Sequence, residues 1–147
     1  MITVLLVDDN GPIRKSVHSL LERADDIEVV ATASNGLDGI EKARSYRPDV
    51  AVMDISMPLM DGIEATEHIR ECCRLTRVIL LSGFDDPEHV QRALEVGAKG
   101  YVLKDAAGED LLEAIHTIHR GSNYFSEKIG EIAKKYLARK GNDGSAV

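Results

Sequence analysis

The chain has 147 residues and a mass of 16.1 kDa, the usual size of one compact domain. Hydrophobic residues make up 44% and charged residues 29% of it, which excludes collagen-like, mucin-like and disordered classes. The net charge of −7 argues against electrostatic binding of nucleic acid by the chain as a whole. No stretch approaches the roughly 20 apolar residues of a membrane span, and the N-terminus shows no basic flank or cleavage site, so we expect a soluble, cytoplasmic protein.

Five short apolar runs alternate with five segments of helical spacing. The runs are rich in β-branched residues, have the length of strands and cover residues 3–7, 27–32, 50–53, 78–81 and 100–103. Between them apolar residues recur every three or four positions, which predicts a helix after each strand. This alternation indicates an α/β fold with a parallel sheet, helices on both faces and strands covered on both sides. The first run is typical of a central strand.

Proline, glycine and one acidic residue mark the ends of several predicted helices. Pro12 and Pro87 fit the first turn of a helix, and Asp86 can cap the helix that Pro87 opens. Gly97 and Gly121 fall where helices should end. These positions support the alternation of strands and helices.

A sixth helix is predicted over residues 126–139, where apolar side chains form one stripe. The stripe consists of Ile129, Ile132, Ala133, Tyr136 and Leu137. From Gly141 onward the composition is typical of a flexible linker, and we expect no further folded domain after it. Residues 122–147 carry 5 basic and 3 acidic side chains, whereas residues 1–121 carry 13 and 22, so we expect the two regions to have different roles.

The two cysteines, Cys72 and Cys73, are adjacent in the sequence. Neighbouring Cα atoms lie ~3.8 Å apart, below the usual disulfide range of ~4.4 to 6.8 Å. We therefore expect reduced thiols, with a vicinal redox switch as the alternative.

Polar side chains follow four of the five predicted strands. They are Asp8 and Asp9 after the first strand, Asp54 after the third, Ser82 after the fourth and Lys104 after the fifth. Ligands of open parallel sheets bind beyond the carboxyl ends of the strands, so these groups should converge. Each of them alone is more often a cap or turn residue, but two carboxylates ~4 Å apart repel by ~4 kcal/mol at an effective dielectric constant of 20. Raised carboxyl pKa values or a divalent cation must offset this repulsion, and Mg²⁺ fits the oxygen ligands.

A magnesium site with one partly free carboxylate supports one kind of covalent chemistry. The free carboxylate can attack phosphorus and form an aspartyl phosphate. Lys104 can then neutralise phosphoryl oxygens, and Ser82 can donate a hydrogen bond to one of them. The residues therefore predict a site that receives a phosphoryl group.

Four sequence motifs and their order resemble the receiver domain of bacterial two-component response regulators. The motifs are VDD at 7–9, MDISMPLMDG at 53–62, LSG at 81–83 and GAKGYVLK at 97–104. The resemblance covers about residues 2–121. It implies a doubly wound, flavodoxin-like (βα)5 sandwich of three layers with strand order 2-1-3-4-5, to which the sixth helix is added.

The resemblance implies a role for each matching residue around the metal. Asp54 matches the phosphoacceptor, Asp9 the direct Mg²⁺ ligand and Asp8 the acid that acts through a bound water. Ser56 would supply its backbone carbonyl to the metal. The expected cofactor is therefore Mg²⁺.

The resemblance also implies a switch rather than an enzyme. Lys104 matches the lysine that pairs with the phosphoryl group, Ser82 the hydroxyl that moves toward it, and Tyr101 the aromatic residue that then turns inward. This movement changes the surface of the fourth helix, fifth strand and fifth helix. Pro58 and Gly62 match residues that shape the loop.

Two positions place the chain nearer to one branch of the family. Asp105 follows Lys104 where many receivers have proline, and Gly83 follows Ser82 where alanine is commoner, as in regulators of the NarL/FixJ type. That branch carries a LuxR-type helix-turn-helix domain. We therefore expect residues 1–121 to form the receiver and residues 122–147 a linker helix and tail, with the DNA-binding domain absent. The implied partners are a sensor histidine kinase, a second copy on phosphorylation, and DNA only through the absent domain.

Three other interpretations are weighed against this one. A stand-alone response regulator would act by protein contact alone. A haloacid-dehalogenase-like phosphohydrolase would need an acid two residues after the nucleophile, where this chain has Ser56. His116 and His119 have a metal-binding spacing but no third ligand in view, which favours a solvated surface pair.

Overall fold

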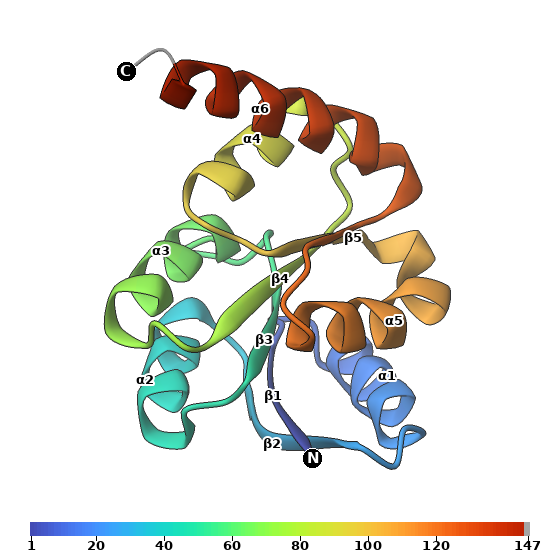
Figure 1. Cartoon of the computed structure of the whole chain (residues 1–147). Helices are drawn as coiled ribbons and strands as arrows, with labels where there is room; N and C mark the ends of the chain where they lie inside the picture. The colour runs from blue at the N-terminus through green and yellow to red at the C-terminus, as the bar shows by residue number, and fades with distance from the viewer. Residues whose placement is uncertain (146–147) are drawn as a thin grey trace.

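The computed structural model describes the backbone of residues 1–145 and the side-chain environment of residues 1–139. Strands and helices alternate as predicted, and all strands run parallel in one sheet of order β2-β1-β3-β4-β5-β6 (Figure 1). The strands are β1 Ile2–Val7, β2 Ile27–Ala33, β3 Val50–Asp54, β4 Arg77–Ser82, β5 Gly100–Leu103 and β6 Tyr124–Phe125. The helices are α1 Gly11–Glu22, α2 Gly36–Tyr46, α3 Gly62–Cys72, α4 Pro87–Glu95, α5 Ala107–His119 and α6 Glu127–Ser145, with a short 3₁₀ turn at Lys104–Ala106.

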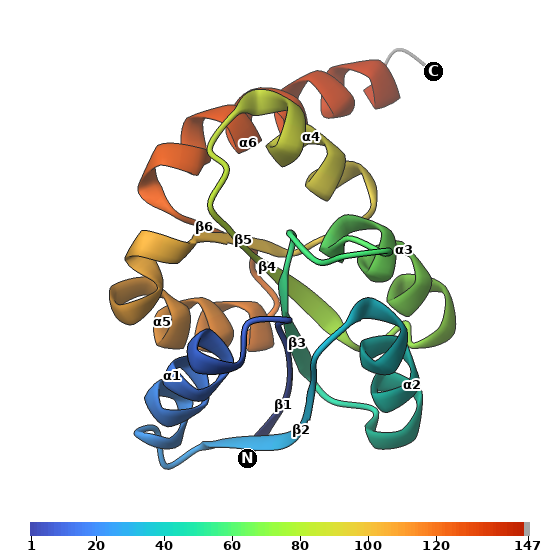
Figure 2. The same ribbon diagram turned by 180° about the vertical axis from the view of Figure 1, so that it is seen from behind.

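The helices cover the sheet from both sides and enclose two apolar cores. Helices α1 and α5 lie on one face, and α2, α3 and α4 lie on the other (Figures 1 and 2). Side chains of β1 alternate between the cores, so Val4 and Leu6 pack with α1 and α5, whereas Leu5 and Val7 pack with α2 and α3. The predicted double cover holds for β3, β4 and β5, but β2 ends the sheet and is only half-buried.

The predicted helix signals lie where the structure uses them. Pro12 and Pro87 occupy the first turns of α1 and α4, and Asp86 caps α4 by accepting from the backbone N–H of His89. Gly97 and Gly121 follow α4 and α5 with φ of 91° and 102°. Both glycines adopt the left-handed conformation that ends helices.

The region after α5 differs from the prediction in two ways. Tyr124–Phe125 forms strand β6 beside β5. This strand was not predicted, because a run of two residues shows no detectable alternation of apolar and polar side chains. Helix α6 continues to Ser145 through the segment predicted as a flexible linker, since a helix that is already formed extends at low cost.

Helix α6 packs on α4 through part of its predicted stripe. Ile129 and Ala133 are fully buried, and Ile132 and Tyr136 pack beside them, but Leu137 is exposed. Figures 1 and 2 show α6 lying across α4. Within residues 1–145, no helix has the length and apolarity required to cross a membrane.

Candidate functional site

The carboxyl ends of β1 and β3 bring the three predicted carboxylates together. Asp8 and Asp54 are buried and Asp9 is exposed, and each offers one oxygen that lies within 4.8 Å of the others. Among the described residues this is the one group of three or more ligating side chains close enough to hold a metal ion. An all-oxygen donor set at this spacing fits a hard divalent cation.

The pKa of the Asp8 carboxyl group is raised in this site. Burial raises its pKa, and the negative charge of Asp54 raises it further, against the hydrogen bond that the backbone N–H of Asn10 donates at 2.9 Å. Arg14, one turn into α1, donates to the backbone oxygen of Asp8 at 2.7 Å. This contact was not predicted, because nothing in the sequence pairs an arginine side chain with a particular carbonyl.

Asp54 is held through one of its two carboxylate oxygens. Oδ1 lies 3.0 Å from the Lys104 ammonium and accepts from the backbone N–H of Ser56 at 3.1 Å. Within the described part of the chain, no hydrogen bond is donated to Oδ2. Contacts to Oδ1 therefore fix the orientation of the buried carboxylate, while Oδ2 accepts no hydrogen bond from the described residues.

The loop after β3 leaves no room for a side chain at Gly62. Its N–H donates to the Ile55 carbonyl at 2.8 Å, and a Cβ atom there would meet the Asp54 carbonyl oxygen at 2.2 Å. Gly62 thus lies against the backbone of Asp54, at the end of β3, and of Ile55, which follows it. This close approach explains why the motif has glycine at this position. Asp61, just before it, caps α3 by accepting from the backbone N–H of Glu64.

Ser82 and Tyr101 form a network that sequence reasoning found only in part. The Tyr101 hydroxyl donates to the Phe84 carbonyl at 2.6 Å and lies 3.1 Å from Ser82 Oγ. Ser82 Oγ also accepts from the Phe84 N–H at 2.9 Å. Tyr101 is buried, which raises the pKa of its hydroxyl, and it already points inward. The role of the Phe84 backbone was missed, since any residue type can supply an N–H and a carbonyl.

The structure also describes the peptide bond after Lys104 and the surroundings of the two histidines. No peptide bond in residues 1–145 is cis, so the bond between Lys104 and Asp105 is trans. His116 Nε2 lies 2.8 Å from the Asp26 carboxylate, and its Nδ1 lies 2.8 Å from the Leu112 carbonyl. The pair formed by His116 and His119 is therefore not a purely solvated one. The described residues place no third ligand beside His116 and His119.

Comparison with known proteins gives a consistent relationship. The family profile of the response regulator receiver domain matches residues 4–116. The transcriptional regulatory protein LnrK of Bacillus subtilis is 38% identical over 121 residues, which are 82% of this chain and 55% of LnrK. The oxygen regulatory protein NreC of Staphylococcus aureus is 39% identical over 127 residues, which are 86% of this chain and 58% of NreC. The chain thus spans little more than half the length of these relatives.

Solved structures show the same relationship. A LuxR-family two-component response regulator from Aurantimonas sp. superposes with a TM-score of 0.86 at 32% identity, over 92% of this chain and 97% of that one. The signal receiver domain of NarL from Mycobacterium tuberculosis superposes with a TM-score of 0.78 at 33% identity, over 82% of this chain and 97% of that one. The chain therefore belongs to the response regulator receiver domain family, and its relatives are regulators of the NarL and LuxR type.

Proposed function

We propose that Asp54 accepts a phosphoryl group from the phosphohistidine of a sensor histidine kinase. The observation that carries this proposal is the carboxylate of Asp54, which is buried, is held through Oδ1 by Lys104 and Ser56, and lies beside two further carboxylates. Oδ2 attacks phosphorus, an O–P bond forms, the N–P bond of the phosphohistidine breaks, and the released imidazole takes up a proton. A receiver domain is in this sense a phosphorylation switch rather than a conventional enzyme.

The residues around Asp54 divide the remaining work. Asp9 and Asp54 would bind Mg²⁺ directly, Asp8 through a water molecule and Ser56 through its carbonyl, and the ion would supply charge neutralisation at the phosphoryl oxygens. Lys104 pairs with one phosphoryl oxygen, and the hydroxyl of Ser82 donates to another. For this, Ser82 must leave its present contacts with Phe84 and Tyr101.

We further propose that the switch controls transcription through a LuxR-type helix-turn-helix domain outside this chain. Residues 1–121 would form the receiver and residues 122–147 the linker. The name of LnrK, a transcriptional regulatory protein, and the LuxR-family designation of the regulator from Aurantimonas sp. support this output. Contact with DNA would then pass through the effector, and a second copy of the chain would bind on phosphorylation. We propose the cytoplasm as the location of the chain and of the site on the kinase that it meets.

The decisive experiment is intact mass spectrometry after incubation with acetyl phosphate and Mg²⁺. We expect a gain of one phosphoryl group in the wild type and none in Asp54→Asn or without Mg²⁺. A gain that persists in Asp54→Asn would overturn the assignment of the acceptor. If the wild type gains nothing and also fails to bind beryllofluoride, it does not accept phosphoryl groups at all. Rapid turnover of a small phosphomonoester would instead support the phosphohydrolase alternative.

A further inference from the structure

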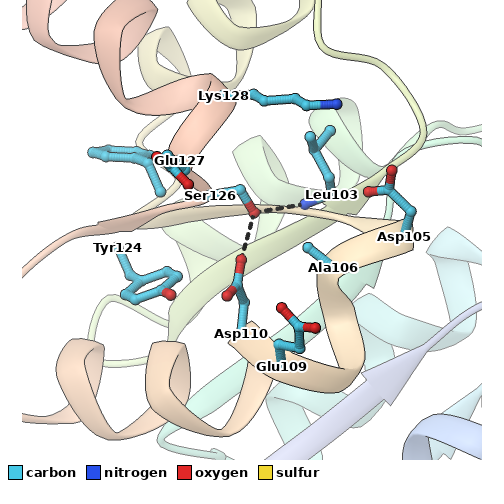
Figure 3. Close-up of a pocket in the computed structure, with 10 residues that line it drawn as sticks. Leu103, Asp105, Ala106, Glu109, Asp110, Tyr124, Ser126, Glu127 and Lys128 are labelled. Atoms are coloured by element: carbon cyan, nitrogen blue, oxygen red, sulfur yellow. Dashed lines mark hydrogen bonds between the residues drawn. The ribbon is translucent and has the colours of Figure 1, made fainter.

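The start of α6 is tied to the strand that carries Lys104. The N–H of Ser126 donates to the Tyr101 carbonyl at 3.0 Å, and its hydroxyl accepts from the N–H of Leu103 at 3.0 Å. The same hydroxyl donates to the Asp110 carboxylate on α5 at 3.1 Å (Figure 3). Ser126 is buried, and Leu103 directly precedes Lys104. The first turn of α6 is therefore fixed relative to the phosphorylation site.

Packing fixes the rotation of α6 as well as its start. Ile129 and Ala133, one helical turn apart, are buried in the core that α4 also contributes to. With Ile129 facing inward, the preceding Lys128 lies on the flank of the helix and is exposed. Figure 3 shows its side chain extending from the start of α6 toward the side on which Asp105 lies.

Lys128 lines a cavity that is also bordered by Lys104, the ion-pair partner of Asp54. The cavity, of about 230 Å³, is bordered by Ser82 and Lys104, and also by Asp85, Asp105 and Lys128. Within the described residues no carboxylate forms an ion pair with Lys128. The α6 helix thus adds a second ammonium group to a cavity whose other charged borders are Lys104 and two carboxylates.

We propose that Lys128 promotes phosphorylation of Asp54 by attracting the negatively charged phosphoryl donor to the site. The proposal rests on the proposed function, since it needs Asp54 to be the acceptor. A phosphoryl group on Asp54 adds roughly −1.5 to −2 charges beside Lys104, which borders a cavity where Asp85 and Asp105 are already negative. Lys128 offsets this negative charge without touching the reacting atoms.

The test compares the initial rates at which acetyl phosphate phosphorylates Lys128→Ala, Lys128→Arg and a control, Lys135→Ala. Lys135 lies two turns further along α6, is also exposed and does not border the cavity. Its loss changes the net charge by the same amount as the loss of Lys128. We expect Lys128→Ala to be about two- to fivefold slower than the wild type, the size expected of one exposed charge interaction, and Lys135→Ala to be unchanged. Lys128→Arg should restore the rate. At about 1 M salt, where the screening length falls to about 3 Å, the difference should vanish.

The outcomes separate this inference from the proposed function. Normal phosphorylation of the wild type with equal rates in Lys128→Ala and Lys135→Ala overturns the inference and leaves the proposed function intact. A slower Lys128→Ala that arginine does not restore, or that salt does not equalise, assigns the effect to packing rather than charge and also overturns it. A wild type that never gains a phosphoryl group overturns both.

Discussion

The carboxylate of Asp54 is oriented by groups from two separate parts of the chain. The Ser56 N–H comes from the loop after β3 and the Lys104 ammonium from the turn after β5, and both bind the same oxygen. The positions of these residues at strand ends were predictable, because parallel strands share one carboxyl end. That both groups bind the same oxygen was not predictable, since this depends on the side-chain rotamer that Asp54 adopts in its buried position.

Replacing Asp8 by asparagine should stabilise the metal-free protein at neutral pH. The folded-state pKa of Asp8 lies above the ordinary 3.8, so the stability linked to this carboxyl is present below pH 3.8 and is lost as the pH rises through the raised value. Asparagine removes the buried charge and still accepts from the N–H of Asn10. We expect Tm to rise at pH 7 by about 2–4 °C, the shift that ~1 kcal/mol produces in a domain of this size, and to be equal for both proteins near pH 3.

Mg²⁺ provides the control for this prediction. Saturating Mg²⁺ should raise Tm of the wild type and have a smaller effect on Asp8→Asn, because a ligand stabilises the state that binds it. An Asp8→Asn variant that is less stable than the wild type at pH 7 without Mg²⁺ would contradict the electrostatic account.

The adjacent cysteines should react at very different rates. Cys73 is buried, and burial together with the neighbouring Cys72 raises the pKa of its thiol to about 11, whereas Cys72 is partly exposed. Only the thiolate is nucleophilic, so iodoacetamide at about pH 8 should modify Cys72 and leave Cys73 intact in the folded protein. Peptide mapping measures this directly. Equal labelling of both residues without denaturant would show that Cys73 is accessible.

At the scale of elements, the strength of the local pattern decided what was predictable. The five long strands were located within two residues because apolar runs and helix signals reinforce one another. Strand β6 and the 3₁₀ turn at Lys104–Ala106 are too short for any periodicity to be detected, and β6 is defined by its pairing with β5. The prediction of a flexible linker from Gly141 onward was wrong for the end of α6. Glycine and asparagine disfavour helices, but here they lie in a helix that continues to Ser145.

Substituting Gly62 by alanine should disturb the loop that carries Asp54. A Cβ atom at this position would lie 2.2 Å from a backbone oxygen that cannot move without shifting β3. We expect a loss of about 3 kcal/mol or more in urea unfolding, at the upper end for overpacking, and slower phosphoryl uptake. Gly130→Ala in α6 is the matched control, since nothing lies within 4 Å of its added Cβ, and it should stabilise by ~0.5–1 kcal/mol. A Gly62→Ala variant as stable as the wild type would show that the loop can relax.

At the scale of the whole molecule, the docked α6 restricts how two copies can pair. Because α6 lies on α4, pairing through α4 would require α6 to leave. We expect beryllofluoride with Mg²⁺ to double the mass measured by light scattering from 16.1 kDa, and Asp54→Asn to stay monomeric. An unchanged mass in wild type that binds beryllofluoride, checked by fluorine NMR, would remove the dimer from the proposed function.

Strand β6 also bears on solubility. Without it β5 would end the sheet with unpaired backbone groups, and such a free sheet edge is a template for pairing with another chain. Tyr124 and Ser126 bind the carbonyls of Lys99 and Tyr101, and the Ser126 hydroxyl takes up the N–H of Leu103. A protein truncated at residue 121 would expose these groups along a buried, apolar strand. Residues 122–126 therefore cover the edge of β5 and protect it from pairing with another chain, and a shortened receiver should retain them.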